Sequence, residues 1–386
     1  MRKFYTAEAV TEGHPDKLCD QIADAILDVC LKQDEQSRVA CEVLATKGTI
    51  IVAGEITSTY EPDVFAVVRK VLSDVGYSSE GIAMDTFVHR QSPDIAGAVD
   101  TSKERREGVS DNQIDWFQGA GDQGVMIGYA CDETKQLMPM PVVLANRIVR
   151  ELSACRQSSY IQGILPDGKA QVTVEYENGK PVRLDSVVVS CQHTEDKNLK
   201  KLEAEIRKKV LLPALRLLPP DEDTKIFINP SGRFVCGGMD ADTGLTGRKL
   251  MVDSYGSMGP HGGGAFSGKD CSKVDRSATY MARYIAKNIV AAGLASKCQV
   301  SLAYAIGVAQ PVMVQVDTFG TGKVCADDCL ELAIPLVFGL TPKQIVDSLR
   351  LTRPIFRQTA AFGHFGRKEF PWERTDKVEA LRNAVI

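Results

Sequence analysis

The sequence predicts an α+β fold of three related domains, each built on the plan helix, β-hairpin, helix. Three observations support this prediction: the length of 386 residues, a composition typical of globular proteins, and an order of predicted elements that occurs three times. A chain this long exceeds one ordinary core, and roughly one domain per 150 residues suggests two or three units. Hydrophobic residues make up 44% and charged residues 25% of the chain, so packed domains are expected.

The first copy of the plan occupies residues 17–76. Apolar residues at helical spacing from Leu18 to Val29 predict a helix, and two strands are predicted on either side of the turn at 47–48. A second helix is expected to open with Pro62 and to stop at Gly76, because proline favours helix starts and glycine favours helix ends.

Two further copies follow along the chain. The second has a helix over 141–157, a hairpin over 171–190 that turns at Asn178-Gly179, and a charged helix over 198–215. The third has a helix capped by Asp275, strands within 299–319 and a helix over 341–351. The copies share element order without residue identity, so coincidence is a competing interpretation. The expected domains are 1–112, 113–235 and 236–386.

Composition and charge exclude several classes of protein. The net charge of −4 gives no global field for nucleic acid or anionic lipid, and no apolar stretch predicts a signal peptide or a membrane span. We therefore expect a cytoplasmic protein with neither a nucleic-acid nor a membrane partner. The 11 cysteines are scattered, with Cys325 and Cys329 the closest pair, which favours reduced thiols over disulfides or a zinc site.

The first motif with chemical content is GHPDK at 13–17. Histidine, aspartate and lysine immediately precede a predicted helix, whose start favours anions. His14 can donate to a phosphoryl oxygen and Asp16 can hold Mg²⁺. The alternative is a solvated cap, which is the more frequent meaning of five such residues considered alone.

The second motif is the glycine-rich segment 262–277. Gly263 to Lys269 has the spacing of a P-loop, but Asp270 stands where a P-loop has Ser or Thr, and no apolar strand precedes it. A P-loop ATPase is therefore not expected. Glycines still let backbone amides approach phosphate, while Lys269 and Lys273 add positive charge.

Two more motifs contain glycines together with charged residues. GAGDQG at 119–124 has the GxGxxG spacing of a dinucleotide enzyme, but a strand is predicted after it rather than a helix, so a Rossmann domain is disfavoured. DTGLTGRK at 242–249 places Asp242 near Arg248 and Lys249, which can spread over a triphosphate. A surface turn with a local ion pair is the alternative. The turns INPSGRF and LPDGKAQV have the same ambiguity.

Taken together, these motifs resemble the signature set of methionine adenosyltransferases, in the family's order, from Phe4 to about Asp376. The resemblance implies three α+β domains in a pseudo-threefold arrangement with interleaved chain segments. It implies transfer of the adenosyl group of ATP to the sulfur of L-methionine, with two Mg²⁺ ions per site and one K⁺ per subunit. It also implies a homodimer, or a homotetramer built from dimers, with active sites shared between subunits.

The resemblance also assigns roles to individual residues. Catalytic roles fall to His14, Lys17, Arg248 and Lys269. ATP binding falls to His14, Asp167, Lys169, Arg233, Phe234, Asp242, Arg248, Lys249, Ala265 and Lys269. Methionine binding falls to Glu55, Gln91, Asp122, Asp242 and Lys273, magnesium to Asp16 and Asp275, and potassium to Glu42.

The segment 92–117 is longer than its counterpart in the compact members of that family, and the resemblance identifies it with the family's mobile active-site loop. Its high charge and lack of apolar periodicity predict low local stability, so we expect a lid that closes over bound substrates.

Three other functional classes stay open at this point. They are another ATP-dependent transferase or kinase, a dinucleotide oxidoreductase, and a nucleotide-binding protein without catalytic activity.

Overall fold

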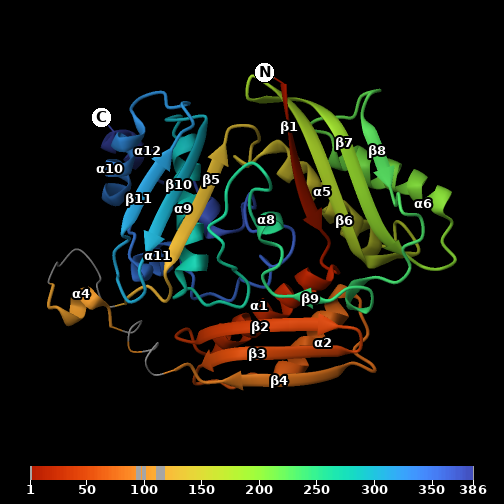
Figure 1. Cartoon of the computed structure of the whole chain (residues 1–386), viewed down its shortest axis with the longest axis horizontal. Helices are drawn as coiled ribbons and strands as arrows, with labels where there is room; N and C mark the ends of the chain where they lie inside the picture. Colours follow the sequence, from red (N-terminus) through yellow and green to blue (C-terminus); the bar gives the residue numbers. More distant parts are fainter. Residues whose placement is uncertain (1, 93–96, 98–100, 110–117, 386) are drawn as a thin grey trace.

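Three β-sheets, each covered by helices, make up the protein (Figure 1). The computed structural model describes residues 2–92, 97, 101–109 and 118–385. Helices and strands are mixed along the described chain, so the predicted α+β class is confirmed. In the view of Figure 1 the sheets lie at the right, the left and the bottom of the molecule.

The sheet at the right has the strand order β1-β6-β7-β8. Its strands are β1 (Arg2–Val10), β6 (Ile164–Glu177), β7 (Lys180–His193) and β8 (Lys225–Ile228). The β6–β7 hairpin turns at Asn178-Gly179, as predicted. Helices α5 (Met140–Gln157) and α6 (Leu199–Ile206) contribute to its apolar core.

The sheet at the left has the order β11-β10-β5, from β5 (Gly124–Cys131), β10 (Lys297–Tyr304) and β11 (Met313–Asp317). Helix α9 (Val274–Ala291) packs closely on β5, because a Cβ on Gly128 would lie 2.0 Å from the backbone of Ala282. Only glycine permits this approach.

The sheet at the bottom has the order β4-β3-β2-β9. It contains β2 (Arg38–Thr46), β3 (Thr49–Thr57), β4 (Ala83–His89) and the short β9 (Gly244–Leu245). Helices α1 (Pro15–Gln33) and α2 (Val64–Val75) cover one face with buried apolar side chains. The capping side chain of Asp63 and the left-handed Gly76 bound α2, close to the predicted limits.

Each sheet takes strands from distant parts of the chain. Strand β1 joins residues 164–228, β9 joins residues 38–89, and β5 joins residues 297–317. The interleaving of segments implied by the family resemblance is therefore present. The intervals 1–112, 113–235 and 236–386 stay a prediction, and all three sheets cross them.

Several local expectations need correction. Helix α9 is capped by Lys273, so Asp275 lies inside its first turn and is not the cap. The charged helix over 198–215 is interrupted, since α6 passes into a π-helical turn at Arg207–Leu211 before α7 (Leu212–Ala214).

Strands β1 and β4 and helix α10 (Asp327–Val337) were not anticipated; Pro335 inside α10 disfavours a helix on propensity alone. Further helices in the described part of the chain are α4 (Lys103–Arg106), α8 (Leu250–Asp253), α11 (Pro342–Leu349), α12 (Val378–Ala384) and the 3₁₀ turns Gly238–Asp240 and Pro371–Glu373.

Within the described ranges, no single helix has the length and hydropathy to cross a membrane. Helices α10 and α11 pass that test only as a pair, and the pair is bent by 75°.

Candidate active site

The GHPDK motif forms the start of α1. His14 is the N-cap, and its Nδ1 accepts a hydrogen bond from the amide of Asp16 at 3.2 Å. The proton of the neutral ring therefore sits on Nε2, which can donate to a ligand. Burial, followed by the positive charge of Lys249, lowers the pKa of His14 to about 4. The ring is thus neutral at physiological pH.

Asp16 is the centre of the charges around this helix start. Lys249 Nζ donates to its carboxylate at 2.6 Å, the amide of Leu245 donates at 3.0 Å, and Arg248 Nε lies 3.7 Å away. Burial disfavours the charged form, but the hydrogen bonds from Lys249 and Leu245 outweigh it and lower the pKa of Asp16. The motifs GHPDK and DTGLTGRK therefore meet, as one site requires.

Lys17 does not occupy the position expected of a triphosphate ligand. Its side chain is fully buried, and its Nζ lies 2.9 Å from Asp20 and 2.5 Å from Asp253. These carboxylates outweigh the effect of burial and raise the pKa of Lys17. In this arrangement Lys17 forms buried ion pairs with two carboxylates, and its catalytic role stays a prediction.

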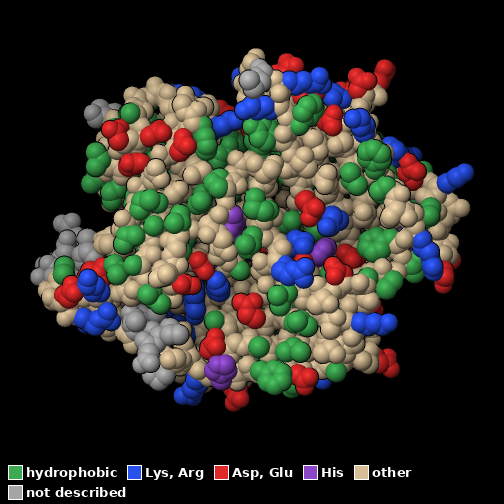
Figure 2. Space-filling view, in the orientation of Figure 1, with side chains coloured by type: hydrophobic (Ala, Val, Ile, Leu, Met, Phe, Trp, Pro, Cys, Tyr) green, Lys and Arg blue, Asp and Glu red, His purple; other side chains and the backbone are tan. Residues whose placement is uncertain are grey.

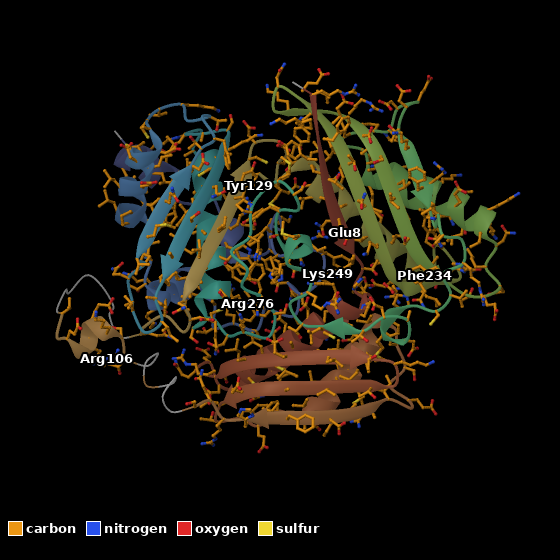
Figure 3. All side chains as sticks on the ribbon, in the orientation of Figure 1. Glu8, Arg106, Tyr129, Phe234, Lys249 and Arg276 are labelled. Atoms are coloured by element: carbon orange, nitrogen blue, oxygen red, sulfur yellow. The ribbon has the colours of Figure 1, made fainter. Side chains whose placement is uncertain are left out.

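Other predicted ATP residues lie around the α1 start. Asp167, Lys169 and Asp242 are close enough for their charges to affect one another or His14. Lys169 also lies 3.5 Å from Glu8, and Figure 3 labels Glu8 and Lys249 in this region. Figure 2, in the same orientation, shows side chains of both charges gathered there.

The turn that carries Arg233 and Phe234 follows β8. Arg233 is exposed and pairs with Glu195 at 2.6 Å, whereas Phe234 is half-buried and is held by backbone hydrogen bonds to His193. Figure 3 places Phe234 at the lower end of the right-hand sheet.

The second cluster surrounds the start of α9. Lys269 Nζ donates to Asp275 at 2.6 Å, and Glu42 on β2 is close enough to Lys269 for their charges to interact. Ala265 lies against Gly247, which joins the 262–277 loop to the 242–249 loop. No strand leads into Gly263 to Lys269, as expected for a loop that is not a P-loop.

Lys273 and Asp122 lie near this second cluster. Lys273 pairs with the buried Asp270, and Arg38 lies 4.0 Å from the same carboxylate. The GAGDQG turn is tied to this loop, since the amide of Gly121 donates to the carbonyl of Ser272 at 3.0 Å. Strand β5 follows the turn directly, so the preference against a Rossmann motif is supported.

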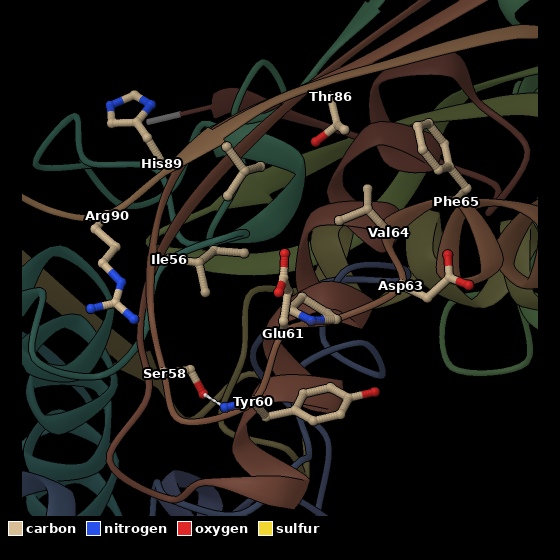
Figure 4. A pocket seen from close by; sticks show the side chains of 12 residues that line it. Ile56, Ser58, Tyr60, Glu61, Asp63, Val64, Phe65, Thr86, His89 and Arg90 are labelled. Atoms are coloured by element: carbon tan, nitrogen blue, oxygen red, sulfur yellow. Dashed lines mark hydrogen bonds between the residues drawn. The ribbon is translucent and has the colours of Figure 1, made fainter.

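Glu55 lies on β3 opposite Ala40 of β2, close enough to Glu42 of the second cluster for their charges to interact, whereas Gln91 follows β4. Glu55 is 3.2 Å from His89 Nε2, and the amide of Gln91 donates to Thr57 at 3.3 Å. Beside them is a cavity of about 470 Å³, but none of the predicted site residues lines it. Figure 4 shows its lining, in which the side chain of Glu61 lies between those of Ile56 and Val64, and Arg90 lies on the other side of Ile56 in this view.

The described part of segment 92–117 is residues 92, 97 and 101–109; the remainder of the predicted lid lies outside the described residues. Ser102 caps α4 and is buried, and Glu104 accepts hydrogen bonds from the amides of Ala309 and Gln310 at 2.9–3.2 Å. This part of the segment therefore has anchoring contacts that its charge did not suggest.

Sequence analysis named Asp16 but missed the three aspartates that follow it on α1. Asp16, Asp20, Asp24 and Asp28 follow one another at intervals of four residues and so share one helix face. Asp20 accepts from the amide of Gly247 and Asp24 from that of Gly268, each at 2.9 Å. One helix face thus holds both glycine loops, and the spacing of four was the available signal.

The donor set fits magnesium held jointly by protein and substrate. Among the described residues, no group of three or more His, Cys, Asp or Glu side chains could hold a metal. Asp16 and Asp275 are single carboxylates beside cations that suit phosphate. Mg²⁺ is commonly bound by one or two carboxylates together with substrate phosphates, so both positions are compatible with it.

Comparison with family models supplies the identity. The N-terminal domain of S-adenosylmethionine synthetase matches residues 2–99, the central domain matches 117–234, and the C-terminal domain matches 236–374. These matches agree with the order of the motifs and with the three sheets, and they do not favour a kinase or an oxidoreductase. The chain therefore belongs to the S-adenosylmethionine synthetase family.

Proposed function

We propose that the clusters at the starts of α1 and α9 together carry the family's reaction in this chain. As a family member, the chain converts ATP and L-methionine into S-adenosylmethionine, a methionine adenosyltransferase activity. The observation that supports the site is the occurrence, at both helix starts, of an aspartate 2.6 Å from a lysine on a glycine-rich loop. Triphosphate and magnesium require this combination of charges.

The reaction mainly requires alignment and stabilisation of the leaving group. The thioether sulfur of methionine is neutral and nucleophilic, so no covalent enzyme intermediate is needed; the sulfur must face the C5′ carbon opposite the departing triphosphate oxygen. His14 donates from Nε2 to that oxygen region, while Arg248, Lys249 and Lys269 stabilise the charge that develops. Lys17 supports the helix start from the core.

Mg²⁺, when bound, would neutralise triphosphate charge and stabilise the leaving group. Asp16 and Asp275 would hold two such ions with phosphate oxygens completing the shells, and Glu42 would hold K⁺ near Lys269. The family generally uses both ions. The hydrolysis of triphosphate to phosphate and pyrophosphate would use the same cations.

The remaining predicted residues divide between the two substrates. Asp167, Lys169, Arg233, Phe234 and Ala265 would line the ATP site, and Asp242 would lie between nucleotide and amino acid. Glu55, Gln91, Asp122 and Lys273 would orient methionine, with carboxylates toward its ammonium group and the lysine toward its carboxylate.

We further propose that each site combines the α1 cluster of one subunit with the α9 cluster of another. Within one chain the charged groups form two centres, at the starts of α1 and α9, and Glu55 lies near the second of them. A homodimer would unite them, and dimers could pair into a tetramer. Cytoplasmic location stays a prediction.

Incubation with ATP, methionine, Mg²⁺ and K⁺, followed by product identification by mass, tests the function. We expect S-adenosylmethionine, phosphate and pyrophosphate, all dependent on methionine. Formation of ADP would indicate a kinase instead, and absence of turnover would indicate a binding protein.

A further inference from the structure

Strand β7 ends in two buried polar residues that lie between two turns of the proposed ATP site. Gln192 is 6% exposed and His193 is 2% exposed. The first turn is the irregular start of strand β6, where the register with β7 shifts between Ile164 and Gly168, and it contains Asp167; this segment was predicted as a plain turn but belongs to the strand. The second turn follows β8 and contains Phe234. We propose that Gln192 and His193 are positioning residues, which hold the two turns in the relative position that ATP binding requires. This inference rests on the proposed assignment of Asp167 and Phe234 to ATP.

Gln192 links the two turns through its side-chain amide. Its Oε1 accepts from the amide of Asp167 at 3.2 Å, and its Nε2 donates to the carbonyl of Val235 at 3.0 Å. A Cβ on Gly237 would lie 2.5 Å from Gln192 Cδ, so the second turn is packed directly on this side chain. Both polar atoms of the buried amide are therefore satisfied by the two turns.

Asp167 adds a second link between the same turns. Its carboxylate accepts from the amide of Gly238 at 2.8 Å, while its own amide is held by Gln192. Burial raises the pKa of Asp167 although the amides of Gly238 and Gly168 oppose this. The orientation of this carboxylate thus depends on Gln192.

His193 forms hydrogen bonds with both the amide and the carbonyl group of Phe234. The amide of His193 donates to the carbonyl of Phe234 at 2.9 Å, and Nε2 of the ring accepts from the amide of Phe234 at 3.0 Å. Nδ1 therefore carries the proton and donates to the carbonyl of Thr194 at 2.8 Å. With its backbone held, the half-buried ring of Phe234 is placed to stack on a base.

The expected consequence is selective for ATP. Neither residue forms a hydrogen bond to Glu55, Gln91, Asp122 or Lys273, the residues assigned to methionine alone, so loosening the turns should weaken ATP binding more than methionine binding. Loss of one buried hydrogen bond costs roughly 1–1.5 kcal/mol, or about tenfold in affinity. A role limited to folding would instead lower the melting temperature without separating the two substrates.

The test compares His193→Phe, which removes the acceptor at Nε2, with His193→Gln, whose Oε1 can replace it. We expect His193→Phe to raise the KM for ATP and the Kd of a non-hydrolysable ATP analogue about tenfold, with the KM for methionine within about twofold. His193→Gln should restore most of the affinity. Gln192→Met, which removes both bonds to the turns, should act like His193→Phe.

The outcomes separate the inference from the function on which it rests. Equal losses in His193→Phe and His193→Gln, or equal changes in both KM values, would overturn the positioning role. Phe234→Ala tests the site itself: unchanged ATP affinity would overturn the ATP assignment and the inference with it. Weakened ATP binding in Phe234→Ala but not in His193→Phe would overturn the inference alone.

Discussion

The starts of α1 and α9 have the same pattern of residue types, whereas the start of α5 does not. The N-cap is His14 in α1 and Lys273 in α9, and two positions later each helix has an aspartate, Asp16 or Asp275. The next residue in each is a fully buried cation, Lys17 or Arg276. Helix α5 instead follows Pro139 with Met140 and Pro141, which carry no charge.

The difference shows how a repeated fold acquires a single type of site. Two of the three long helices have charged starts facing glycine loops, and the third starts with apolar residues that serve packing. Lys17 is paired by its own helix and by α8, but Arg276 is paired by Asp24 of α1 at 2.6 and 2.8 Å. The two charged starts are thus physically connected through α1.

The largest loss of adenosyl-transfer rate is expected from changes in the two aspartate–lysine pairs of the proposed site. Asp16→Asn and Lys269→Met should each lower adenosyl transfer by 100-fold or more, in the range of about 10² to 10³ for removal of one electrostatic stabiliser. If each site joins the α1 start of one subunit to the α9 start of the other, verified heterodimers of these variants should regain about half of the wild-type rate, because one of two sites is intact.

The matched control for that experiment is a heterodimer of Asp122 and Lys269 variants, which lie in the same cluster and should not complement. Recovery in the control but not in the first heterodimer would contradict the division of the site between α1 and α9.

His14→Asn tests the N-cap of α1. Loss of a neutral Nε2 donor should slow transfer by about 10²-fold, with the fold retained because Asn also caps helices. The ordinary pKa of histidine is about 6.5, so between pH 6.5 and 4 the unfolded chain binds more protons at His14 than the folded chain. Stability should therefore rise with pH in this window, and less steeply in the variant. Unfolding by urea at several pH values measures the slope, and near-normal turnover would exclude the role.

Lys273→Met tests the N-cap of α9. We expect the KM for methionine to rise about tenfold and the KM for ATP to change less, since a charge-assisted hydrogen bond to the substrate is lost. Because the change also leaves Asp270 without its lysine, the double variant Asp270→Asn/Lys273→Met should recover thermal stability but not the methionine KM. Parallel changes in both KM values would mean that Lys273 does not discriminate the substrates.

The smallest effect on turnover is expected for Arg276→Lys. The guanidinium makes two hydrogen bonds to Asp24 and others to Thr359 and Tyr280, and an ammonium group cannot reproduce this fork. Stability should fall by about 1–3 kcal/mol, because the ammonium group keeps the charge but leaves buried acceptors without a donor, while kcat for the folded fraction stays within a few-fold. Calorimetry and active-site titration separate the two quantities, and a large loss of kcat at unchanged stability would assign Arg276 to the chemistry.

Local patterns were sufficient to predict the helices and hairpins with clear periodicity, including α1, α2 and the β6–β7 pair. Strand β1 escaped prediction because its partner lies more than 150 residues away, and α10 because Pro335 opposes a helix locally. The meeting of Asp16 with Lys249 followed from motif order and resemblance. The burial of Lys17 did not, because one charged residue beside another does not reveal which of them enters the core.

The pairing of β1 with β6 has a consequence for biosynthesis. Val10 lies opposite Lys169 and Arg2 opposite Glu177, while α1 begins only five residues after Val10 and belongs to a different sheet. At a synthesis rate of about 5–20 residues per second, about 10–30 s pass between the synthesis of β1 and that of its partner β6. During that time this nine-residue strand has no sheet edge with which to pair, so β1 is a segment of the nascent chain that chaperones would need to shield.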